Sequence, residues 1–402
     1  MGTGLIVGVW VARYLGPHLF GQLNFALAFV SIFSAVASLG LDSIVVRELV
    51  RDPENEKVIL ASAWTLRLLG GTVATVLAVV AIVISDPSDH VEIILVVITA
   101  IGMIFQSFDT LEQWFQARLQ SRYAVYVRNF VFFACAFGKI ILIRLSAPLV
   151  AFAAMGLLEI ILGAFALAIA YLILAKSAIC FSLQRAKELL RDSWPLIFSS
   201  LVTMVYLRID QIMLKEIVGD RELGVYSAAV KIAEVWYFIP MAIHASVTPH
   251  VVEEKKHGED RFLSCLQKIY NLMAFIGYAV AVPLSLAGPF IVSILYGVEY
   301  ARGGIMLSLL AWSILFVNMG VARSLYLTTM NWNKVHFVTV LIGAIVNVTL
   351  NVWLIPRFGG FGAAIATLVS YWVAAHLSCY LYRPLRTTGE MLTSALMNPR
   401  FW

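Results

Sequence analysis

The stretch "YLGPHLFGQLNFALAF" occupies residues 14–29, and "EIVGDRELGVYSAAVKI" occupies residues 216–232. In both, a glycine is followed by four residues and then by a second glycine that opens an apolar segment. The matched glycines lie 203 residues apart, about half the chain: Gly16 with Gly219, and Gly21 with Gly224. Because glycine adopts positive φ without a steric penalty, we expect each pair to close a tight turn between two helices. The spacing predicts an internal repeat of two helical halves.

The composition identifies the solvent of these helices. Hydrophobic residues make up 61% of the 402 residues, charged residues 13%, and the mean hydropathy is +0.87. Soluble domains have roughly 45–50% apolar and about 25% charged residues. A water-soluble core of this size cannot bury the excess, so the sequence predicts an all-α polytopic membrane protein.

Segments long enough to span a bilayer recur along the whole chain, since a spanning helix needs about 20 mostly apolar residues. The first candidate is short and resembles the second half of a helix whose beginning is missing; it lacks the basic start of a signal peptide. We predict about twelve transmembrane helices, at 2–15, 22–41, 66–84, 92–108, 129–145, 148–174, 195–217, 224–250, 269–295, 304–327, 335–355 and 361–382.

The repeat predicts how these helices are grouped. We expect an N-terminal lobe of six helices (1–180), a cytoplasmic amphipathic linker (181–194) and a C-terminal lobe of six helices (195–402). Both halves begin on the same side because six is even, so the repeat is parallel. In transporters built from such repeats the substrate path lies between the lobes.

Lysine and arginine in the connecting loops predict the orientation. Most of the 29 basic residues follow even-numbered spans: Arg47, Arg51, Lys57, Arg67, Arg118, Arg122, Arg128, Lys176, Arg185, Lys187, Arg191, Lys255, Lys256, Arg261, Lys268, Arg323, Lys334, Arg383, Arg386 and Arg400. Both termini are therefore expected in the cytoplasm. These positive charges are dispersed, whereas a nucleic-acid site would need them clustered on one face, so we expect no nucleic-acid partner.

Motifs of catalysis, metal binding and ATP binding are missing from the sequence. The four cysteines form no CxxC pair, the seven histidines show no HExxH spacing, and no GxxxxGK[ST] loop occurs. We therefore expect no enzyme activity, catalytic residue, metal or cofactor. A transporter of this kind would draw energy from an ion gradient.

Opposite charges stand inside two neighbouring apolar helices. "MVYLRIDQIML" (204–214) carries Arg208 and Asp210, and the next helix carries Lys231 and Glu234. Each charge at mid-membrane costs at least about 2.5–3.5 kcal/mol on insertion scales. Helix geometry places all four in one layer of the membrane, and the second pair shares a helix face because it is three residues apart.

Two interpretations of this layer remain open. The four groups could form structural ion pairs that hold the two helices together. Alternatively, they could line a water-filled cavity in which Arg208 and Lys231 engage an anionic substrate. The equivalent first-half positions are uncharged (Leu5, Val7, Ala28 and Ser31), which favours an asymmetric ligand.

Other charged residues are further candidates. Arg67 and Arg323 lie near inner helix ends, where snorkelling to the interface explains them as well as function does. Lys139 lies deeper in the fifth helix, and Glu159 lies near the centre of the sixth without an evident local partner. Helix breaks or kinks are predicted at Pro240, Pro283, Gly288 and Pro289.

Several stretches together resemble one family of membrane proteins, the oligosaccharide (O-antigen, Wzx-type) flippases of the multidrug/oligosaccharidyl-lipid/polysaccharide (MOP) exporter superfamily. The similar stretches span nearly the whole chain: "VWVARYLGPHLFGQLNFALAFVSIFSAVASLGLDSIVVRELVRD" (9–52), "YLRIDQIML" (206–214), "GVYSAAVKIAEVWYFIP" (224–240) and "NKVHFVTVLIGAIVNVTLNVWLIPRFGGFGAAIATLVSYWV" (333–373).

The resemblance implies a V-shaped, two-lobed bundle in the inner membrane that flips an undecaprenyl-diphosphate-linked oligosaccharide by alternating access. Its implied partners are this lipid-linked oligosaccharide, membrane lipids, and the polymerase and glycosyltransferases of O-antigen, lipopolysaccharide or exopolysaccharide synthesis. By motif, Arg208, Asp210, Lys231 and Glu234 line the central cavity, and Arg47 lies at its cytoplasmic mouth beside Glu48. Family members usually begin about 20 residues earlier.

Three other functions are considered beside this one. A multidrug or cation antiporter of the same superfamily would need a mainly acidic cavity, whereas the charges here are mixed. A membrane-embedded glycan polymerase or glycosyltransferase would need a larger outer loop or an acidic nucleotide-sugar site. A structural membrane protein would need no cavity. For a transporter, Asp210 or Glu234 is the candidate carrier of a coupling proton.

Overall fold

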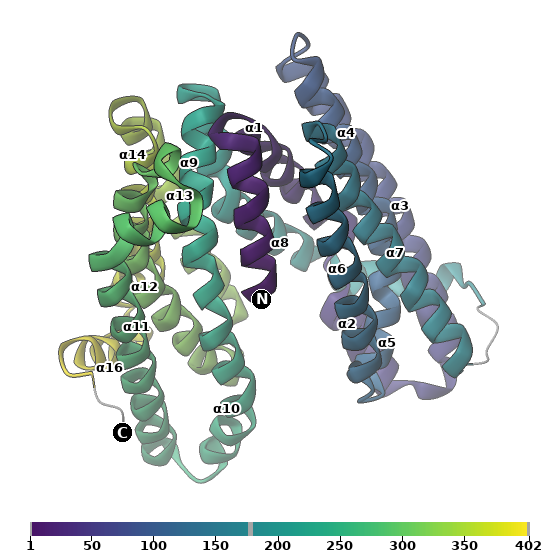
Figure 1. Ribbon diagram of the computed structural model, residues 1–402. Helices are drawn as coiled ribbons and strands as arrows, with labels where there is room; N and C mark the ends of the chain where they lie inside the picture. Colours follow the sequence, from purple (N-terminus) through teal and green to yellow (C-terminus); the bar gives the residue numbers. More distant parts are fainter. Residues whose placement is uncertain (1, 176–179, 400–402) are drawn as a thin grey trace. The chain divides into compact units, whose positions relative to one another are not determined.

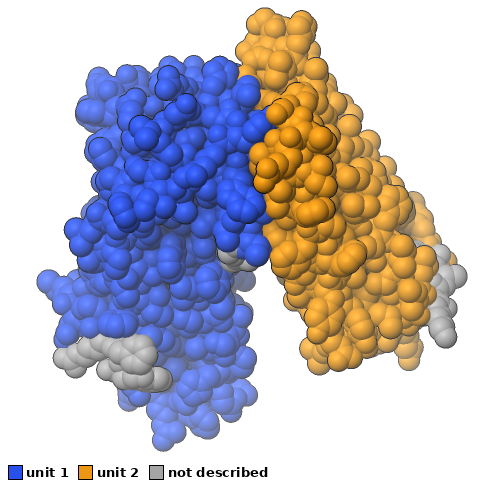
Figure 2. Space-filling view, viewed as in Figure 1, with its two compact units in different colours: residues 1–21, 209–402 blue, residues 22–208 orange. Residues whose placement is uncertain are grey.

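The computed structural model describes residues 2–175 and 180–399, and it contains helices and no strand within those ranges (Figure 1). The predicted basic loop residues Lys176 and Arg400 lie outside the described part. The chain divides into two compact units, shown in different colours in Figure 2: unit 1 comprises Met1–Gly21 and Ile209–Trp402, and unit 2 comprises Gln22–Arg208. Helices α1 (Gly2–Ser38) and α8 (Leu183–Val218) contribute residues to both units. The lobe boundaries expected from the repeat, at 180 and 195, do not coincide with the boundaries of these two units. The division into lobes stays a prediction.

Unit 2 is a bundle of helices in which both neighbouring and more distant elements of the sequence pack together. Its further elements are α2 (Asp42–Arg51), η1 (Pro53–Asn55), α3 (Glu56–Ser85), α4 (His90–Phe105), η2 (Gln106–Phe108), α5 (Asp109–Ala117), α6 (Ser121–Arg144) and α7 (Leu149–Ala175). Helix α3 packs on α4, α4 and α6 pack on α7, and α2 packs on α5. The core around α2 and α5 is mainly aliphatic and includes an aromatic pair: the ring of Trp114 meets that of Tyr171 edge to face at 5.0 Å.

Unit 1 is built around α12, which is buried along most of its length. Its elements are α9 (Asp220–Glu234), η3 (Val235–Tyr237), α10 (Phe238–Lys256), α11 (Glu259–Tyr296), η4 (Val298–Tyr300), α12 (Gly303–Thr329), α13 (Asn333–Phe358), α14 (Gly360–Trp372), the π-helix η5 (Val373–Leu377), α15 (Ser378–Leu381), η6 (Arg383–Leu385) and α16 (Arg386–Met397). Helices α9, α10, α11 and α14 all pack on α12, and α11 and α12 run side by side (Figure 1).

Ten helical stretches of the described chain are long and apolar enough to cross a membrane. The all-α membrane fold is therefore confirmed, although the count differs from twelve for two reasons. The first two predicted spans lie in one stretch, Thr3–Arg51, and the chain bends between them at Gly16 (φ 69°, ψ 171°). The eighth, 224–250, is divided by η3 and interrupted by charged and histidine side chains, and it is not among the ten.

Prolines interrupt the helices less than the sequence predicts. Helix α11 continues for 38 residues through Pro283 and Pro289, so the predicted break there is wrong. Helix α8 likewise continues through Pro195, joining the predicted linker to the seventh span. The break near Pro240 lies at η3 instead, and Pro240 occupies the first turn of α10, where a missing N–H costs no helical hydrogen bond.

The two repeated glycine pairs have two different roles. Gly16 and Gly219 adopt positive φ (69° and 110°), as predicted for the turns. Gly21 and Gly224 instead face each other where α1 crosses α9 in unit 1. A Cβ on Gly21 would lie 1.9 Å from the carbonyl oxygen of Asp220, and a Cβ on Gly224 would lie 1.9 Å from that of Pro17. The contact is symmetric, because the offset of 203 residues relates Gly21 to Gly224 and Pro17 to Asp220.

Arg323 is buried in unit 1 and does not snorkel, contrary to one of the two interpretations. It is 2% exposed, and its Nη1 donates to the carbonyl oxygen of Ala374 (2.7 Å) and to Oγ of Ser378 (2.8 Å). Its Nη2 donates to Oγ1 of Thr339 at 2.9 Å. The carbonyl belongs to the π-helix η5, whose wider turn displaces backbone groups from the α-helical pattern. The arginine thus binds a backbone irregularity rather than a carboxylate.

We expect Gly224→Ala to destabilise the protein, because the new methyl group cannot fit against the carbonyl of Pro17 without moving a helix. Overpacking of this kind costs about 1–3 kcal/mol. Thermal unfolding in detergent, followed by tryptophan fluorescence, measures the effect. Gly8→Ala is the matched control, since a Cβ at Gly8 meets no atom within 4 Å. Equal midpoints for the two variants would contradict the close contact.

We expect Arg323→Lys to destabilise the protein more than Arg323→Met. Lysine keeps the buried charge but cannot reproduce the planar fork that reaches three acceptors, and each hydrogen bond to a charged group contributes about 1.5–3 kcal/mol. Methionine removes the charge together with its desolvation cost, so replacement by an apolar side chain of similar size is often tolerated. The same thermal unfolding assay ranks the variants, and a lysine variant as stable as wild type would contradict this account.

Candidate functional site

Asp210 is the centre of a buried polar cluster in unit 1. Its side chain is 6% exposed and lies on α8. The hydroxyl of Tyr226, on α9, donates to its Oδ2, and Oγ1 of Thr367, on α14, lies 3.5 Å from the same oxygen. The carboxylate therefore connects three helices within a region of apolar side chains.

The cluster continues along α13 and α14. Oγ of Ser370 donates to the carbonyl oxygen of Thr367 (3.0 Å) and accepts from Nδ2 of Asn347 (3.2 Å). Nδ2 of Asn351 in turn donates to Oδ1 of Asn347 at 2.9 Å. These oxygen-rich groups are the class of ligand that hard cations and protons use. The sequence analysis missed them, although two asparagines four residues apart on one face of an apolar helix were a signal.

Lys231 and Glu234 lie on the last turns of α9, and both are half-buried. The ammonium group of Lys231 lies 4.5 Å from the ring centroid of Phe20, which is itself buried. A cation over an aromatic face keeps its charge in an apolar region. Glu234 is the last residue of α9, immediately before the helix narrows into η3.

Arg208 lies two residues before Asp210 on α8, at the end of unit 2, and is half-buried. Tyr237 of η3 lies within electrostatic reach of both Asp210 and Glu234. Asp210, Lys231 and Glu234 all belong to unit 1, the first on α8 and the other two on α9. Their role in binding a substrate stays a prediction.

Arg67 is paired in unit 2 and does not snorkel. It is 3% exposed, and its Nη2 lies 2.5 Å from Oδ1 of Asp42, which also accepts from Nε2 of Gln113 at 2.9 Å. The snorkelling interpretation is therefore wrong for Arg67, because the guanidinium finds a carboxylate inside the unit.

A polar pocket of about 530 Å³ opens beside this pair in unit 2. Arg128 bridges two of its acids, with Nη2 at 2.6 Å from Asp109 and Nε at 2.6 Å from Glu112. The pocket is lined by Asp42, Ser43, Val46, Asp109, Glu112, Gln113, Gln116 and Arg128. Nearly all of its lining can form hydrogen bonds.

Lys139 and Glu159 form an ion pair, which corrects the description of Glu159 as lacking a partner. Nζ of Lys139, on α6, lies 2.8 Å from Oε2 of Glu159, on α7, and both side chains are half-buried. Each charge thereby offsets the other within the bundle. This pair holds two neighbouring helices of unit 2 together.

Arg47 lies on the exposed side of α2, next to a group of acidic residues. Its Nε lies 3.0 Å from Oε1 of Glu48, and its Nη2 lies 2.5 Å from Oδ2 of Asp192 on α8. Arg185, also on α8, reaches the second oxygen of Glu48 at 3.1 Å. Three predicted cations of unit 2, Arg47, Arg67 and Lys139, are thus each engaged by a carboxylate.

One group of acids has the spacing of a metal site within the described residues. Ligand atoms of Asp86, Asp89 and Glu92 lie within 4.8 Å of one another. Two of the three already have structural roles: Oδ1 of Asp86 accepts from Ser88, and Oδ1 of Asp89 caps α4 by accepting from the backbone N–H of Glu92 at 3.0 Å. The geometry of this turn is therefore explained by capping.

Comparison with known proteins relates the chain to polysaccharide export. The family described as "Polysaccharide biosynthesis protein" matches residues 1–253, and the family "MatE" matches residues 195–353. The "Capsular polysaccharide biosynthesis protein CapF" of Staphylococcus aureus is 25% identical over 50% of this chain and 51% of its own length. The "Probable flippase AglR" of Haloferax volcanii is 31% identical over 42% of this chain and 37% of its own length.

A third relative, the "Putative O-antigen transporter" of Shigella dysenteriae, is 26% identical over 48% of each chain. The chain thus spans about half the length, or less, of the curated relatives that it matches.

Solved structures share the fold over almost the whole chain. An inward-facing multidrug resistance MATE family transporter of the MOP superfamily superposes with a TM-score of 0.77 at 16% identity, covering 98% of this chain and 95% of the other. The lipid II flippase MurJ, in an inward closed conformation, superposes with a TM-score of 0.74 at 14% identity, covering 98% and 89%. With the family match over more than half its length, this multi-pass membrane protein belongs to the polysaccharide biosynthesis protein family.

Proposed function

We propose that the protein is a flippase that moves a polyprenyl-diphosphate-linked oligosaccharide from the inner to the outer leaflet of the plasma membrane by alternating access. The family match and the names of the relatives support this class of cargo. Loop charges support an orientation with both termini in the cytoplasm. Membrane lipids surround the protein, and enzymes that assemble the glycan supply and consume its cargo.

Two half-buried cations carry this proposal. The ammonium group of Lys231 lies 4.5 Å from the ring centroid of Phe20 in unit 1, and Arg208 lies two residues before Asp210 on α8. A cation retained there stabilises an anion, and a diphosphate is the anionic part of the proposed cargo. Arg208 and Lys231 offset the diphosphate charge, while Asp210 and Glu234 keep the empty site close to neutral.

The cations of unit 2 have a different role in this proposal. Arg67 and Lys139 each share a carboxylate inside their unit, so neither adds a net positive charge. Together with the polar pocket beside Asp42, they offer hydrogen-bonding groups suited to a glycan. Arg47, which is exposed and paired with Asp192, lies at the cytoplasmic mouth.

Asp210 is proposed as the group that binds the coupling ion. Its buried side chain accepts a hydrogen bond from the hydroxyl of Tyr226 and lies 3.5 Å from Oγ1 of Thr367, and a buried carboxylate of this kind suits a proton or a small cation. Binding a cation there would change the charge of a cluster that connects α8, α9 and α14. An ion gradient could therefore bias those helices between two arrangements.

A multidrug or cation antiporter is the second candidate function. The MatE match over residues 195–353 and the fold shared with a MATE transporter favour it. The half-buried ammonium group of Lys231 argues for an anionic cargo instead, because it would repel a cationic drug. Drug resistance conferred on a sensitive strain, without rescue of polysaccharide export, would identify the antiporter.

We expect Arg208→Ala and Lys231→Met to lower complementation of a flippase-null strain, measured as surface polysaccharide, by about tenfold or more. Losing one charge-assisted contact costs about 1.5–3 kcal/mol, equivalent to roughly 10–100-fold in binding. Lys231→Arg should retain part of the activity because it keeps the charge. Lys256→Gln is the matched control, since Lys256 is an exposed cation paired with Glu253. Full rescue by both charge-removing variants would leave these residues a structural role only.

We expect Asp210→Asn to uncouple transport of the cargo from the ion gradient. The amide keeps the shape and a hydrogen bond to Tyr226 but carries no charge, so it cannot bind a coupling cation as the carboxylate does. Transport into membrane vesicles, measured with and without imposed proton and sodium gradients, should respond to one gradient in wild type and to neither in the variant. Wild-type transport that is indifferent to both gradients would overturn the coupling role.

A further inference from the structure

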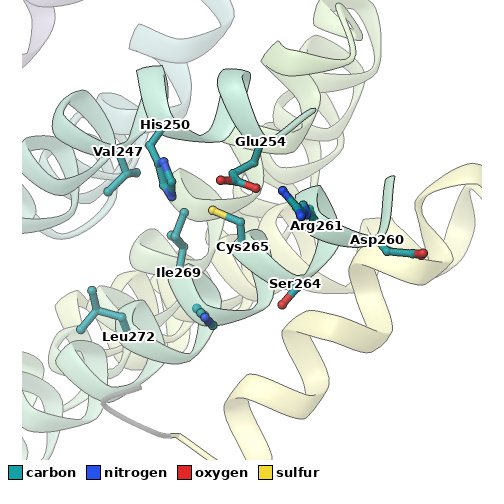
Figure 3. A pocket seen from close by; sticks show the side chains of 10 residues that line it. Val247, His250, Glu254, Asp260, Arg261, Ser264, Cys265, Ile269 and Leu272 are labelled. Carbon is teal, nitrogen blue, oxygen red and sulfur yellow. The ribbon is translucent and has the colours of Figure 1, made fainter. Parts of the chain in front are cut away.

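A pocket of about 560 Å³ lies between α10 and α11 in unit 1, beside the turn that joins them (Figure 3). In Figure 3, His250 and Glu254 extend from α10 toward Cys265 and Ile269 on α11, whereas the carboxylate of Asp260 points away from the other side chains. The lining residues are Val247, His250, Glu254, Asp260, Arg261, Ser264, Cys265, Lys268, Ile269 and Leu272.

The pocket has a charged end and an apolar end. Along α11 the charged end comes first, as expected for a helix that passes from the headgroup region into the hydrocarbon. Arg261 and Lys268 precede Ile269 on α11, and from Ile269 onward the helix is apolar. The helix has 38 residues and is about 57 Å long at 1.5 Å per residue, which exceeds the roughly 30 Å hydrocarbon core. Its charged first turns therefore extend into the headgroup region, while the buried Ile269 and the half-buried Leu272 form the apolar end of the pocket.

Three charged side chains that line the pocket form no ion pair with another described residue. On the same hairpin, Lys255 pairs with Glu259 and Lys256 pairs with Glu253. The side chains of Arg261, Lys268 and Glu254, in contrast, make no hydrogen bond and no ion pair within the part of the chain that the structure describes. Two cations and one half-buried carboxylate therefore remain available to a ligand that carries both signs of charge.

We propose that this pocket binds phosphatidylethanolamine. Arg261 and Lys268 take the phosphate, the carboxylate of Glu254 accepts from the ammonium group, and an acyl chain lies along Val247, Ile269 and Leu272. Phosphatidylcholine fits less well, because its quaternary ammonium has no N–H to donate. Phosphatidylglycerol provides the phosphate but leaves Glu254 without a cation. Inorganic phosphate leaves the apolar end unfilled.

The site is independent of the proposed transport function, since it uses none of the residues assigned to the cargo. A lipid bound there joins α10 to α11 at the membrane surface. The bound lipid would hold the hairpin together where the protein itself supplies few polar contacts.

Native mass spectrometry of the full chain in detergent tests the proposal with phosphatidylethanolamine, phosphatidylcholine and phosphatidylglycerol of identical acyl chains. Wild type should retain one phosphatidylethanolamine more tightly than either other lipid. Arg261→Gln and Lys268→Gln should each weaken that binding about fivefold, the effect expected of one basic residue at a membrane surface. Glu254→Gln should abolish the preference for phosphatidylethanolamine over phosphatidylcholine.

Lys256→Gln is the control, because Lys256 belongs to the same hairpin but is paired with Glu253 and lies outside the pocket. Thermal unfolding without added lipid should be unchanged in every variant, since Arg261 and Lys268 are exposed. Equal lipid retention by Lys268→Gln and Lys256→Gln would overturn the site. So would binding of phosphatidylcholine as tight as that of phosphatidylethanolamine, or displacement of the lipid by inorganic phosphate alone.

Discussion

The crossing of Gly21 and Gly224 is the contact on which the arrangement of unit 1 depends. Two helix starts, related by the sequence repeat, approach until the backbone of each fills the place of the other's missing side chain. This close approach fixes α9 against the first residues of the chain. It also sets Lys231, two turns beyond Gly224, over Phe20, the residue next to Gly21. The position of Lys231 thus follows from a close approach that only glycine allows.

Charges inside the helices are accommodated in several distinct ways. Arg67 and Lys139 each pair with a carboxylate, Arg323 binds a backbone carbonyl and two hydroxyls, and Asp210 accepts from hydroxyls. Pairing cancels charge, whereas hydrogen bonding to neutral groups preserves it in a low-dielectric region. In each case the surrounding groups offset the cost of holding a charge inside the bundle.

The sequence was sufficient to predict the membrane fold, since composition alone requires the bilayer, and to predict the turns at Gly16 and Gly219. It also singled out Asp210 and Lys231 as charges inside helices. The sequence could not predict contacts that depend on tertiary packing. Glu159 pairs with Lys139 only because α6 and α7 pack together, and Arg323 donates to a carbonyl oxygen 51 residues away. The breaks predicted at Pro283 and Pro289 were wrong, because the long helix α11, which packs on α12, tolerates the loss of single backbone hydrogen bonds.

The π-helix at Val373–Leu377 has a consequence for comparing this chain with its relatives. A π turn holds one more residue than an α turn, and each residue rotates the helix by about 100°. The side chains of Ser378–Leu381, which continue the helix, are therefore displaced around the axis from the faces that α-helical counting assigns to them. An alignment without a gap would assign these positions to the wrong helix face, unless the related chain shares both the extra residue and an arginine to occupy its carbonyl.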